Sequence, residues 1–418
     1  MPGYDAGNPP GGSRAGLEVL FAIADQQASA KPDAPWAATK PLIPLPHSCI
    51  VAMVPAYNEE EGIAETIESL LAQTRRPDLI VVIPNGCRDR TAEIARRYPV
   101  TVYELDRCEH KKSEALNRGW WKYARHADLV VCTDGDTVLP PHAVADWEAE
   151  FAANPGLGGS SSQPVMTGYG FLPRMQRNEF AKSAYLSLRR GWCRVISGTG
   201  CCYRGQTLRQ MAQIPGQEGP WTYLSVVEDY HLTYQMRLAG WLAEMSRTVY
   251  CYTGSMYTLR QLWLQRIKWQ SGTCGDLIRF GFNRRNWREW AQQGFGLVCI
   301  AFWAVWLALN VSLAATGHLQ VSWSWLAFPA FFSVIETAHV RHIRPEFRDW
   351  KDYLLAASTV QVVFYAFISG AWIIASWWKV ITNNQQDMWN MQYASEGIEA
   401  AVLDLADNPD QVLQELAR

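Results

Sequence analysis

Two aspartates separated by one glycine stand at the end of an apolar run. The stretch ADLVVCTDGDT, residues 127–137, is rich in aliphatic residues until it reaches Asp134 and Asp136. Two carboxylates this close repel each other, and a divalent cation between them and a phosphate relieves the repulsion. Mg²⁺ and Mn²⁺ prefer hard oxygen ligands and commonly take one or two carboxylates plus substrate phosphates. The spacing favours a Mg²⁺ or Mn²⁺ site; in the alternative, the aspartates cap a helix that begins near Pro141.

The segments around this pair alternate between two patterns. From Ser48 onward, continuous apolar runs typical of buried strands alternate with stretches of helical spacing. This alternation predicts a parallel sheet covered by helices on both faces, a doubly wound α/β domain. The expected strands are 49–55, 78–84, 100–105 and 127–133, and the expected helices are 60–73, 91–98 and 113–126.

Three polar segments follow these expected strands. They are VPAYNEE, PNGCRD and TDGDT. Ligands of doubly wound sheets bind just beyond the carboxyl ends of the strands. We therefore expect the three segments to meet on one edge of the sheet, with Asp134 and Asp136 among them.

The composition leaves room for more than one unit. At 418 residues, the chain is long enough for a catalytic domain and a smaller part. Because 38 Lys+Arg balance 40 Asp+Glu, no nucleic-acid partner is expected. The ten cysteines include no CxxC pair, which matches neither a zinc site nor a disulfide framework. The amino terminus has no secretory signal pattern, so the first domain is expected to lie in the cytoplasm.

Seven short motifs follow one another over roughly residues 48–275. They are VPAYNE (54–59), NGCRD (85–89), Lys112 with ALN (115–117), DGD (134–136), SGTG (197–200) with Arg204, ED (228–229) with LT (232–233) and GW (240–241), and QRIKW (265–269). This series resembles the family 2 glycosyltransferases, and more narrowly the membrane-integrated branch that includes cellulose, chitin and hyaluronan synthases. The resemblance implies a GT-A domain (nucleotide-diphospho-sugar transferase, Rossmann-like) followed by carboxyl-terminal interfacial and transmembrane helices.

The resemblance also assigns residues to a nucleotide-sugar donor, with a UDP-sugar expected. Tyr57 would stack on the base, Glu59 would accept from ribose or base, and Asp89 would accept from the base. Lys112 would bring a positive charge to the phosphates. The alternatives are a buried aromatic for Tyr57, helix-capping acids for Glu59 and Asp89, and a solvated helix face for Lys112. The expected donor set is Pro55, Tyr57, Glu59, Asn85, Asp89, Lys112, Asp134 and Gly135.

One position near Lys112 departs from the family pattern. Lys111 stands where the family usually has glycine. This replacement puts the conformation of the loop in question more than the charge of Lys112.

The acceptor side carries the expected base. A carboxylate within hydrogen-bond reach of the acceptor hydroxyl takes its proton, and Asp229 is the candidate by resemblance and by chemistry. In an extended backbone Glu228 would face the opposite way; the alternative is an acidic N-cap for a helix at 230–238. In-line displacement assisted by one carboxylate predicts inversion at the anomeric carbon. The expected acceptor and diphosphate contacts are Gly198, Thr199, Glu228, Gln265, Arg266, Lys268 and Trp269.

The QRIKW segment has Leu and Trp residues at helical spacing. Trp269 would support the acceptor's terminal sugar, because aromatic faces suit the axial C–H groups of sugars. In the alternative it is a core residue. Lys268 replaces the family's arginine and cannot make a bidentate phosphate contact, so processive growth is less firmly implied than transfer itself.

After Trp290 the composition becomes that of membrane segments. Residues 291–317 and 353–378 are long enough to cross a hydrocarbon core of about 30 Å. A third run, 319–335, is at the short limit and contains Pro329. The basic link RHIRPEFRDWK is expected in the cytoplasm, which favours counting the third run as a span. In the alternative, all three are buried helices of a soluble domain.

These features predict a multi-pass membrane enzyme with a cytoplasmic catalytic domain. The expected function is inverting, metal-dependent transfer from a nucleotide sugar to a carbohydrate, lipid or protein acceptor, with the lipid bilayer as a further partner. Processive polysaccharide synthesis and single-sugar transfer both remain open, and a nucleotidyltransferase or a non-catalytic nucleotide-binding membrane module is the rival class. The expected domains are an arm at 1–46, a catalytic domain at 47–254, interface helices at 255–290, membrane helices at about 291–317, 319–340 and 353–378, and a tail at 379–418.

Overall fold

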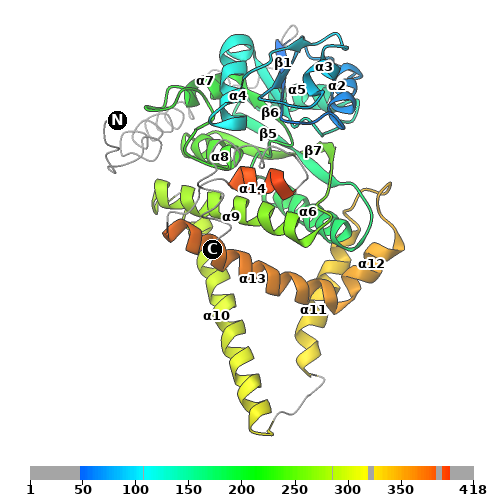
Figure 1. Cartoon of the computed structure of the whole chain (residues 1–418), viewed down its shortest axis with the longest axis vertical. Coiled ribbons are helices and arrows are strands. Elements are labelled where there is room, and N and C mark those ends of the chain that lie inside the picture. The colour runs from blue at the N-terminus through cyan, green and yellow to red at the C-terminus, as the bar shows by residue number, and fades with distance from the viewer. Residues whose placement is uncertain (1–47, 107, 285, 319–323, 383–387, 396–418) are drawn as a thin grey trace. The chain divides into compact units, whose positions relative to one another are not determined.

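The chain forms two compact units (Figure 1). The computed structural model describes residues 48–106, 108–284, 286–318, 324–382 and 388–395. Unit 1 contains the described residues up to Gly168 together with Glu179–Ser255, and unit 2 contains Tyr169–Asn178 together with the described residues from Met256 onward. The expected arm at 1–46 and most of the expected tail lie outside the described residues.

A mixed seven-stranded sheet forms the centre of unit 1, in the order β3-β2-β1-β4-β6-β5-β7. The parallel pairing predicted for the first four strands is confirmed. β6 runs antiparallel to both of its neighbours, which the sequence pattern did not predict. The strands are β1 Ile50–Ala56, β2 Leu79–Pro84, β3 Thr101–Val102, β4 Leu129–Thr133, β5 Leu157–Met166, β6 Gly200–Arg204 and β7 Leu242–Thr253.

Helices cover both faces of this sheet. Alternate residues of β1, among them Ile50 and Val54, pack in one core with Ile67 of α2 and Trp147 of α5. On the other face, α4 packs against β1 and β2. The helices of unit 1 are α2 Ile63–Leu71, α3 Thr91–Ala95, α4 Lys111–Gly119 with a π-helical continuation at Trp120–Ala124, α5 Ala143–Ala153, α7 Gly205–Met211 and α8 Glu228–Leu238, and α6 Phe171–Arg190 contributes to both units.

Unit 2 is helical. Its long helix α9 begins with a capping box, in which the Thr258 side chain and the Gln261 side chain each bind the other's backbone, and packs against α13 and α14. The apolar run at 353–378 is divided at Ser358, whose extended backbone separates α12 from α13. The helices of unit 2 are α9 Leu259–Phe280, α10 Trp287–Ala315, α11 Ser324–Val340, α12 Trp350–Ala357, α13 Thr359–Ile381 and α14 Met388–Ser395.

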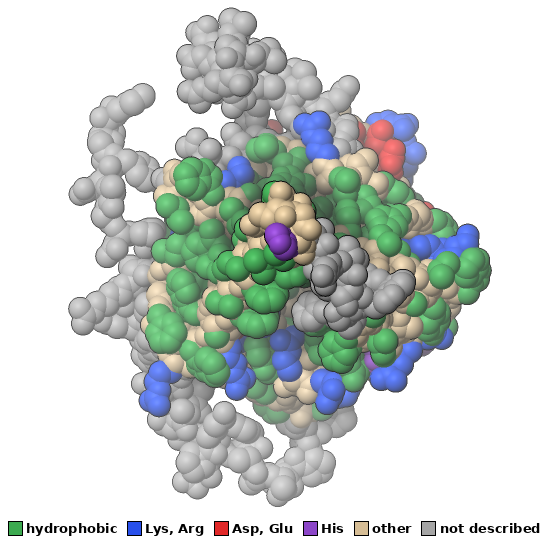
Figure 2. All heavy atoms as spheres, turned by 90° about the horizontal axis from the view of Figure 1, so that it is seen from below, with side chains coloured by type: hydrophobic (Ala, Val, Ile, Leu, Met, Phe, Trp, Pro, Cys, Tyr) green, Lys and Arg blue, Asp and Glu red, His purple; other side chains and the backbone are tan. Residues whose placement is uncertain are grey.

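Two of these helices, α10 and α13, are long and apolar enough to cross a membrane by length and composition. None of the most apolar window of α10 is buried, and only 17% of that of α13 is. Seen from the end where α10 and α11 project, hydrophobic side chains gather around these helices (Figure 2). Of the third expected run, residues 319–323 lie outside the described residues, and α11 contains Pro329.

Candidate active site

The DGD loop follows β4 and lies beside the SGTG loop. β4 and β6 pair antiparallel with Thr133 opposite Gly200, so the end of one strand meets the start of the other. The Thr199 carbonyl accepts from the Asp134 N–H (3.3 Å) and from Thr133 Oγ1 (3.0 Å). The antiparallel strand therefore brings the predicted acceptor loop to the predicted metal loop.

Two hydroxyl groups, one from the DGD loop and one from β7, bind the Asp136 carboxylate. Thr137 Oγ1 donates to Asp136 Oδ1 (3.1 Å), and Thr253 Oγ1 donates to Asp136 Oδ2 (3.3 Å). Burial raises the pKa of the Asp136 carboxyl, and the negative charge of Asp134 raises it further. The helix-capping alternative is wrong for this pair, because α5 begins at Ala143 with His142 at its N-cap and no side-chain capping hydrogen bond.

Lys112 lies between two acidic groups. Its Nζ forms an ion pair with Asp134 and lies 3.5 Å from Glu228 Oε1. Burial lowers the pKa of the ammonium, but the charges of Asp134 and Glu228 more than offset this, so its pKa lies above the ordinary value. Lys112 therefore does not belong to a solvated helix face.

The second acidic pair opens α8. Val227 is the N-cap, with no side-chain capping hydrogen bond, but Asp229 accepts from a first-turn N–H, so the capping alternative holds in part for Asp229 and not for Glu228. The pair is helical and not extended, and the side chains diverge because successive helical residues are rotated by about 100°. Glu228 is buried against Lys112, whereas Asp229 Oδ2 accepts from the Gly198 N–H (3.2 Å) and Oδ1 from the Tyr230 N–H (2.7 Å).

Gly198 lies where these groups meet. A Cβ built on it would lie 2.8 Å from Lys112 Nζ and 3.9 Å from Asp229 Cβ. The structure thus brings together Lys112, Asp134, Gly198, Glu228 and Asp229 from four separate segments of unit 1.

The loop after β1 packs directly against the DGD loop. A Cβ built on Gly135 would lie 2.9 Å from Glu59 Cγ and 3.3 Å from Ala56 Cβ. Pro55 is buried in β1, and Tyr57, which follows that strand, is half-buried. Glu59 and Gly135 therefore lie in contact, as expected for segments that follow neighbouring parallel strands.

The loop after β2 uses its polar side chains to hold its own backbone. Asp89 Oδ1 accepts from the N–H and the hydroxyl of Thr91 (3.0 and 2.6 Å), and Oδ2 accepts from the Glu60 N–H (2.9 Å). The buried Asn85 accepts from the Cys108 N–H (3.0 Å). Asp89 thus joins the loops that follow β1 and β2, and base recognition by Asp89 and Asn85 stays a prediction.

The QRIKW residues form a separate group on α9 in unit 2. The Arg266 guanidinium carbon lies 4.7 Å from the centroid of the Trp269 ring, and Lys268 Nζ lies 3.2 Å from the centroid of Trp389 on α14. Arg266 and Lys268 are buried, and Gln265 and Trp269 are half-buried. Their acceptor and diphosphate contacts stay predictions.

A family model described as "Glycosyltransferase like family 2" matches residues 46–272. This range covers more than half of the chain and contains every motif of the series. The chain belongs to glycosyltransferase family 2. It is therefore an enzyme of the glycosyltransferase class, as the motifs predicted.

Relatives with curated names support the same class. This glycosyltransferase is 26% identical to a poly-beta-1,6-N-acetyl-D-glucosamine synthase of Staphylococcus aureus strain COL over 242 residues, 56% of this chain and 57% of that protein. It is 26% identical to the synthase of the same name from Staphylococcus epidermidis over 236 residues, 54% and 55% of the two chains. The chain thus spans a little over half the length of the curated relatives it matches.

A solved structure supports the GT-A fold of this glycosyltransferase. A mannosyltransferase from Pyrobaculum calidifontis, in complex with GDP-Man and Mn²⁺, superposes with a TM-score of 0.51 and 18% identity. The match covers 84% of this chain and 99% of that one. The GT-A fold expected from the motif series is confirmed.

The residues that support this site in the glycosyltransferase include Asn117 from the motif series and two serines that the sequence patterns missed. The Asn117 side chain donates to the Trp221 carbonyl (2.7 Å) and accepts from the Trp221 N–H (3.1 Å), and so fixes the segment that leads to α8. Ser161 Oγ accepts from the Ser197 N–H (3.2 Å), and Ser162 Oγ donates to the Gly200 carbonyl (2.6 Å). The signal was the SSSQ run in β5, since small polar residues buried in a strand need partners.

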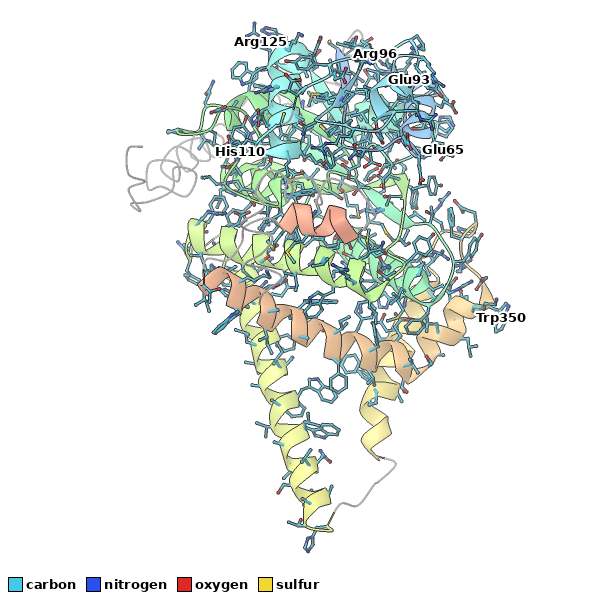
Figure 3. All side chains as sticks on the ribbon, viewed as in Figure 1. Glu65, Glu93, Arg96, His110, Arg125 and Trp350 are labelled. Carbon is cyan, nitrogen blue, oxygen red and sulfur yellow. The ribbon has the colours of Figure 1, made fainter. Side chains whose placement is uncertain are left out.

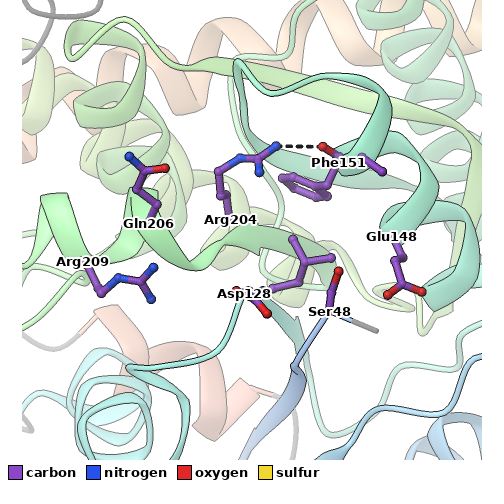
Figure 4. A pocket seen from close by; sticks show the side chains of 9 residues that line it. Ser48, Asp128, Glu148, Phe151, Arg204, Gln206 and Arg209 are labelled. Atoms are coloured by element: carbon purple, nitrogen blue, oxygen red, sulfur yellow. Dashed lines mark hydrogen bonds between the residues drawn. The ribbon is translucent and has the colours of Figure 1, made fainter. Parts of the chain in front are cut away.

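Arg204, which the motif series groups with the SGTG loop, lies at the other end of β6. It pairs opposite Leu129 and lines a hollow of about 140 Å³ at the amino end of β4 (Figure 4). Its guanidinium donates to the carbonyls of Phe151, Asn154 and Leu157. Arg204 therefore holds the turn between α5 and β5 and is not part of the acceptor loop.

We expect Gly135→Ala to destabilise unit 1 by about 1–3 kcal/mol, the usual cost of overpacking. The reason is the contact with Glu59, whose Cγ would lie 2.9 Å from the new methyl group. Gly254→Ala is the matched control, because a Cβ there has no atom within 4 Å. Urea denaturation measures both variants, and equal stability of the two would contradict the close packing of the loops.

We expect Lys111→Gly to raise the free energy of unfolding by up to about 1 kcal/mol, because left-handed backbone is costly for residues with a Cβ. Lys111 has φ +50°, so the lysine keeps a conformation that suits glycine. Lys122→Gly, at a helical position, should instead lower stability. A destabilised Lys111→Gly in the same denaturation assay would show that the lysine side chain outweighs the backbone strain.

Proposed function

We propose that this enzyme transfers a sugar from a UDP-sugar to a hydroxyl acceptor with inversion, using Mg²⁺ or Mn²⁺ held by Asp134 and Asp136. The observation that carries the proposal is the convergence of the DGD loop, Lys112 and Asp229 around Gly198. Sugar transfer needs a cation near the donor phosphates, which the DGD loop and Lys112 would supply, and a base near the acceptor hydroxyl, which Asp229 would supply.

The carboxylate pair suits a hard divalent cation. Asp136 lies two residues from Asp134, and desolvation together with the repulsion between the two charges raises the pKa of Asp136. Among the described residues no group of three or more His, Cys, Asp or Glu side chains is arranged to hold a metal ion. The remaining ligands would therefore come from donor phosphates and water, as is common for Mg²⁺. When bound, the cation neutralises charge on the leaving diphosphate.

Lys112 adds a positive charge at the same place. Its ammonium group is shared between Asp134 and Glu228, on the side of the DGD loop that faces α8. Glu228 thus keeps Lys112 charged and oriented. Lys112 is expected to bind donor phosphate as a point charge.

Asp229 is the proposed base. The Gly198 N–H holds one of its oxygens toward the acceptor loop, and Asp229 is only partly buried. A carboxylate in this position accepts the proton of the attacking hydroxyl. Because no second nucleophilic carboxylate is needed, the sugar is expected to invert.

The relatives support a polysaccharide product. The staphylococcal synthases are named for poly-beta-1,6-N-acetyl-D-glucosamine, which favours an N-acetylhexosamine donor and processive growth here. Single-sugar transfer to a lipid or protein is the second candidate, favoured by Lys268 in place of the family's arginine.

Membrane attachment through unit 2 belongs to the same proposal. In a soluble protein, long apolar helices are buried, but Phe295 and Val305 of α10 are each 69% exposed. This exposure favours spans over core helices. We propose a multi-pass protein whose unit 1 lies in the cytoplasm.

A donor screen tests the function. Purified protein with Mn²⁺ or Mg²⁺ is given UDP-N-acetylglucosamine, UDP-glucose and GDP-mannose, and released nucleotide and product mass are measured. A UDP-sugar is expected to be consumed, with a ladder of product lengths for processive growth and one added sugar for single transfer. Turnover of GDP-mannose alone would overturn the UDP assignment, and release of sugar 1-phosphate without free nucleoside diphosphate would favour nucleotidyl transfer.

A further inference from the structure

Helix α12, Trp350–Ala357, buries a charged residue and exposes large apolar ones, the reverse of an amphipathic helix on the surface of a soluble protein. Its buried residues are Asp352 and Ala356. Trp350, Leu354 and Tyr353 are 67%, 61% and 38% exposed. These three lie at i, i+4 and i+3, the spacing of one helical face. The apolar stripe therefore faces outward.

An ion cluster fixes the inner face of α12. Arg174 of α6 binds both oxygens of Asp349 (2.6 Å each) and Asp352 Oδ1 (2.8 Å). Asp349 and Asp352 also form a capping box at the start of the helix. Since the arginine and both acids belong to unit 2, α12 cannot turn its apolar stripe inward without breaking this cluster.

The outer face is large and aromatic. Trp350 projects away from the ribbon at the outer edge of α12 (Figure 3). A tryptophan left in water forgoes much of the free energy that burial of its ring would provide. A short helix with this pattern is typical of segments that lie in the plane of a membrane surface.

Basic residues precede this stripe in the sequence and reach its first turn. The segment 341–351 carries Arg341, Arg344, Arg348 and Lys351 against two carboxylates, Glu346 and Asp349. Asp349 is neutralised by Arg174, and Arg344 pairs with Glu346 (2.9 Å). Arg341 and Lys351 are exposed, and Lys351 Nζ lies 5.9 Å from the centroid of the Trp350 ring, so an exposed cation borders the apolar stripe.

In the sequence, a single residue separates α12 from a candidate span. α12 ends at Ala357, and α13, one of the two helices apolar enough to cross a membrane, begins at Thr359. α12 packs against α11 and α13 within unit 2. A bilayer that contains α13 would therefore meet α12 at its surface.

We propose that α12 is an interfacial anchor that inserts Trp350, Tyr353 and Leu354 among lipid chains, while Arg341 and Lys351 bind the phosphates of anionic phospholipids. The inference rests on the proposed membrane attachment of unit 2. Aromatic rings favour the boundary between head groups and chains, and cations near it favour anionic lipids. A protein partner would fit the apolar stripe but gives no reason for the cationic border or for the continuity with α13.

Insertion is tested with the full chain in nanodiscs that contain lipids spin-labelled near the head group. Trp350→Phe should remove part of the quenched tryptophan fluorescence. Trp121→Phe, at a 46% exposed tryptophan of unit 1, is the control and should leave the quenched part unchanged. Unchanged quenching in Trp350→Phe, with other tryptophans still quenched, would overturn the anchor while leaving membrane attachment intact. Absence of all quenching would instead overturn the attachment itself.

Lipid charge is tested by thermal melting of the detergent-solubilised chain. Added phosphatidylglycerol should raise the melting temperature more than phosphatidylcholine, because a ligand of the native state stabilises it. The Arg341→Gln/Lys351→Gln double variant should need about tenfold more phosphatidylglycerol for the same rise. The control, Arg96→Gln/Arg97→Gln, removes two exposed cations of unit 1 and should respond like wild type. An unchanged response of the first double variant, or an equal rise with inorganic phosphate, would overturn lipid recognition.

Discussion

Asp229→Asn is expected to bind the nucleotide sugar normally and to lose transfer by roughly a hundredfold or more, the scale of general-base loss. The amide keeps the shape of the side chain, and its oxygen can still accept from the Gly198 N–H. It cannot take the proton of the acceptor hydroxyl. Donor affinity by calorimetry and initial rates of sugar transfer measure the two effects separately.

The control for Asp229 is an aspartate in the first turn of another helix. Asp146 lies in the first turn of α5, as Asp229 lies in the first turn of α8. Asp146→Asn should leave both donor affinity and transfer unchanged. If Asp229→Asn kept wild-type turnover, the base would have to be another residue.

Asp136→Asn is expected to abolish the Mn²⁺-dependent part of donor binding. A neutral amide is a much weaker ligand for a hard cation than a carboxylate. In wild type, Mn²⁺ with UDP should raise the melting temperature, because the pair binds only the native state. The variant should show little or no such rise.

The metal-free behaviour of Asp136→Asn provides a second check. The folded-state pKa of Asp136 is raised by burial and by Asp134, so ionisation above that pKa costs stability at neutral pH. The neutral asparagine is expected to melt no lower than wild type without metal. Glu65→Gln, on the exposed face of α2, should keep the full response to Mn²⁺ with UDP. A full response in Asp136→Asn would contradict the assignment of this carboxylate to the metal.

The contact between the loop after β1 and the DGD loop could be predicted from the sequence. Both follow strands of continuous apolar character, and the rule for the carboxyl ends of parallel strands places Glu59 near Gly135, as found. β6 could not be predicted as antiparallel, because GCCYR is short and β5 beside it contains buried serines instead of an apolar run. Its direction nonetheless brings Thr199 to Asp134.

Other features depend on long-range partners. A lysine in a polar segment looks solvated until Asp134 and Glu228, far along the chain, are known to surround it. The break at Ser358 lies inside a run without charges, so composition alone suggested one continuous span. For Asp89, capping and base recognition were both compatible with the residues; its bonds to Thr91 and Glu60 appear only in the folded loop.

The most direct measurement is the anomeric configuration of the product, followed by ¹H NMR with purified protein and an α-linked UDP-sugar, with and without EDTA. The proposed roles of Asp134, Asp136 and Asp229 predict a β-linked product whose formation stops when EDTA removes the cation and resumes with added Mn²⁺. An α-linked product, or transfer that continues unchanged in EDTA, would contradict them.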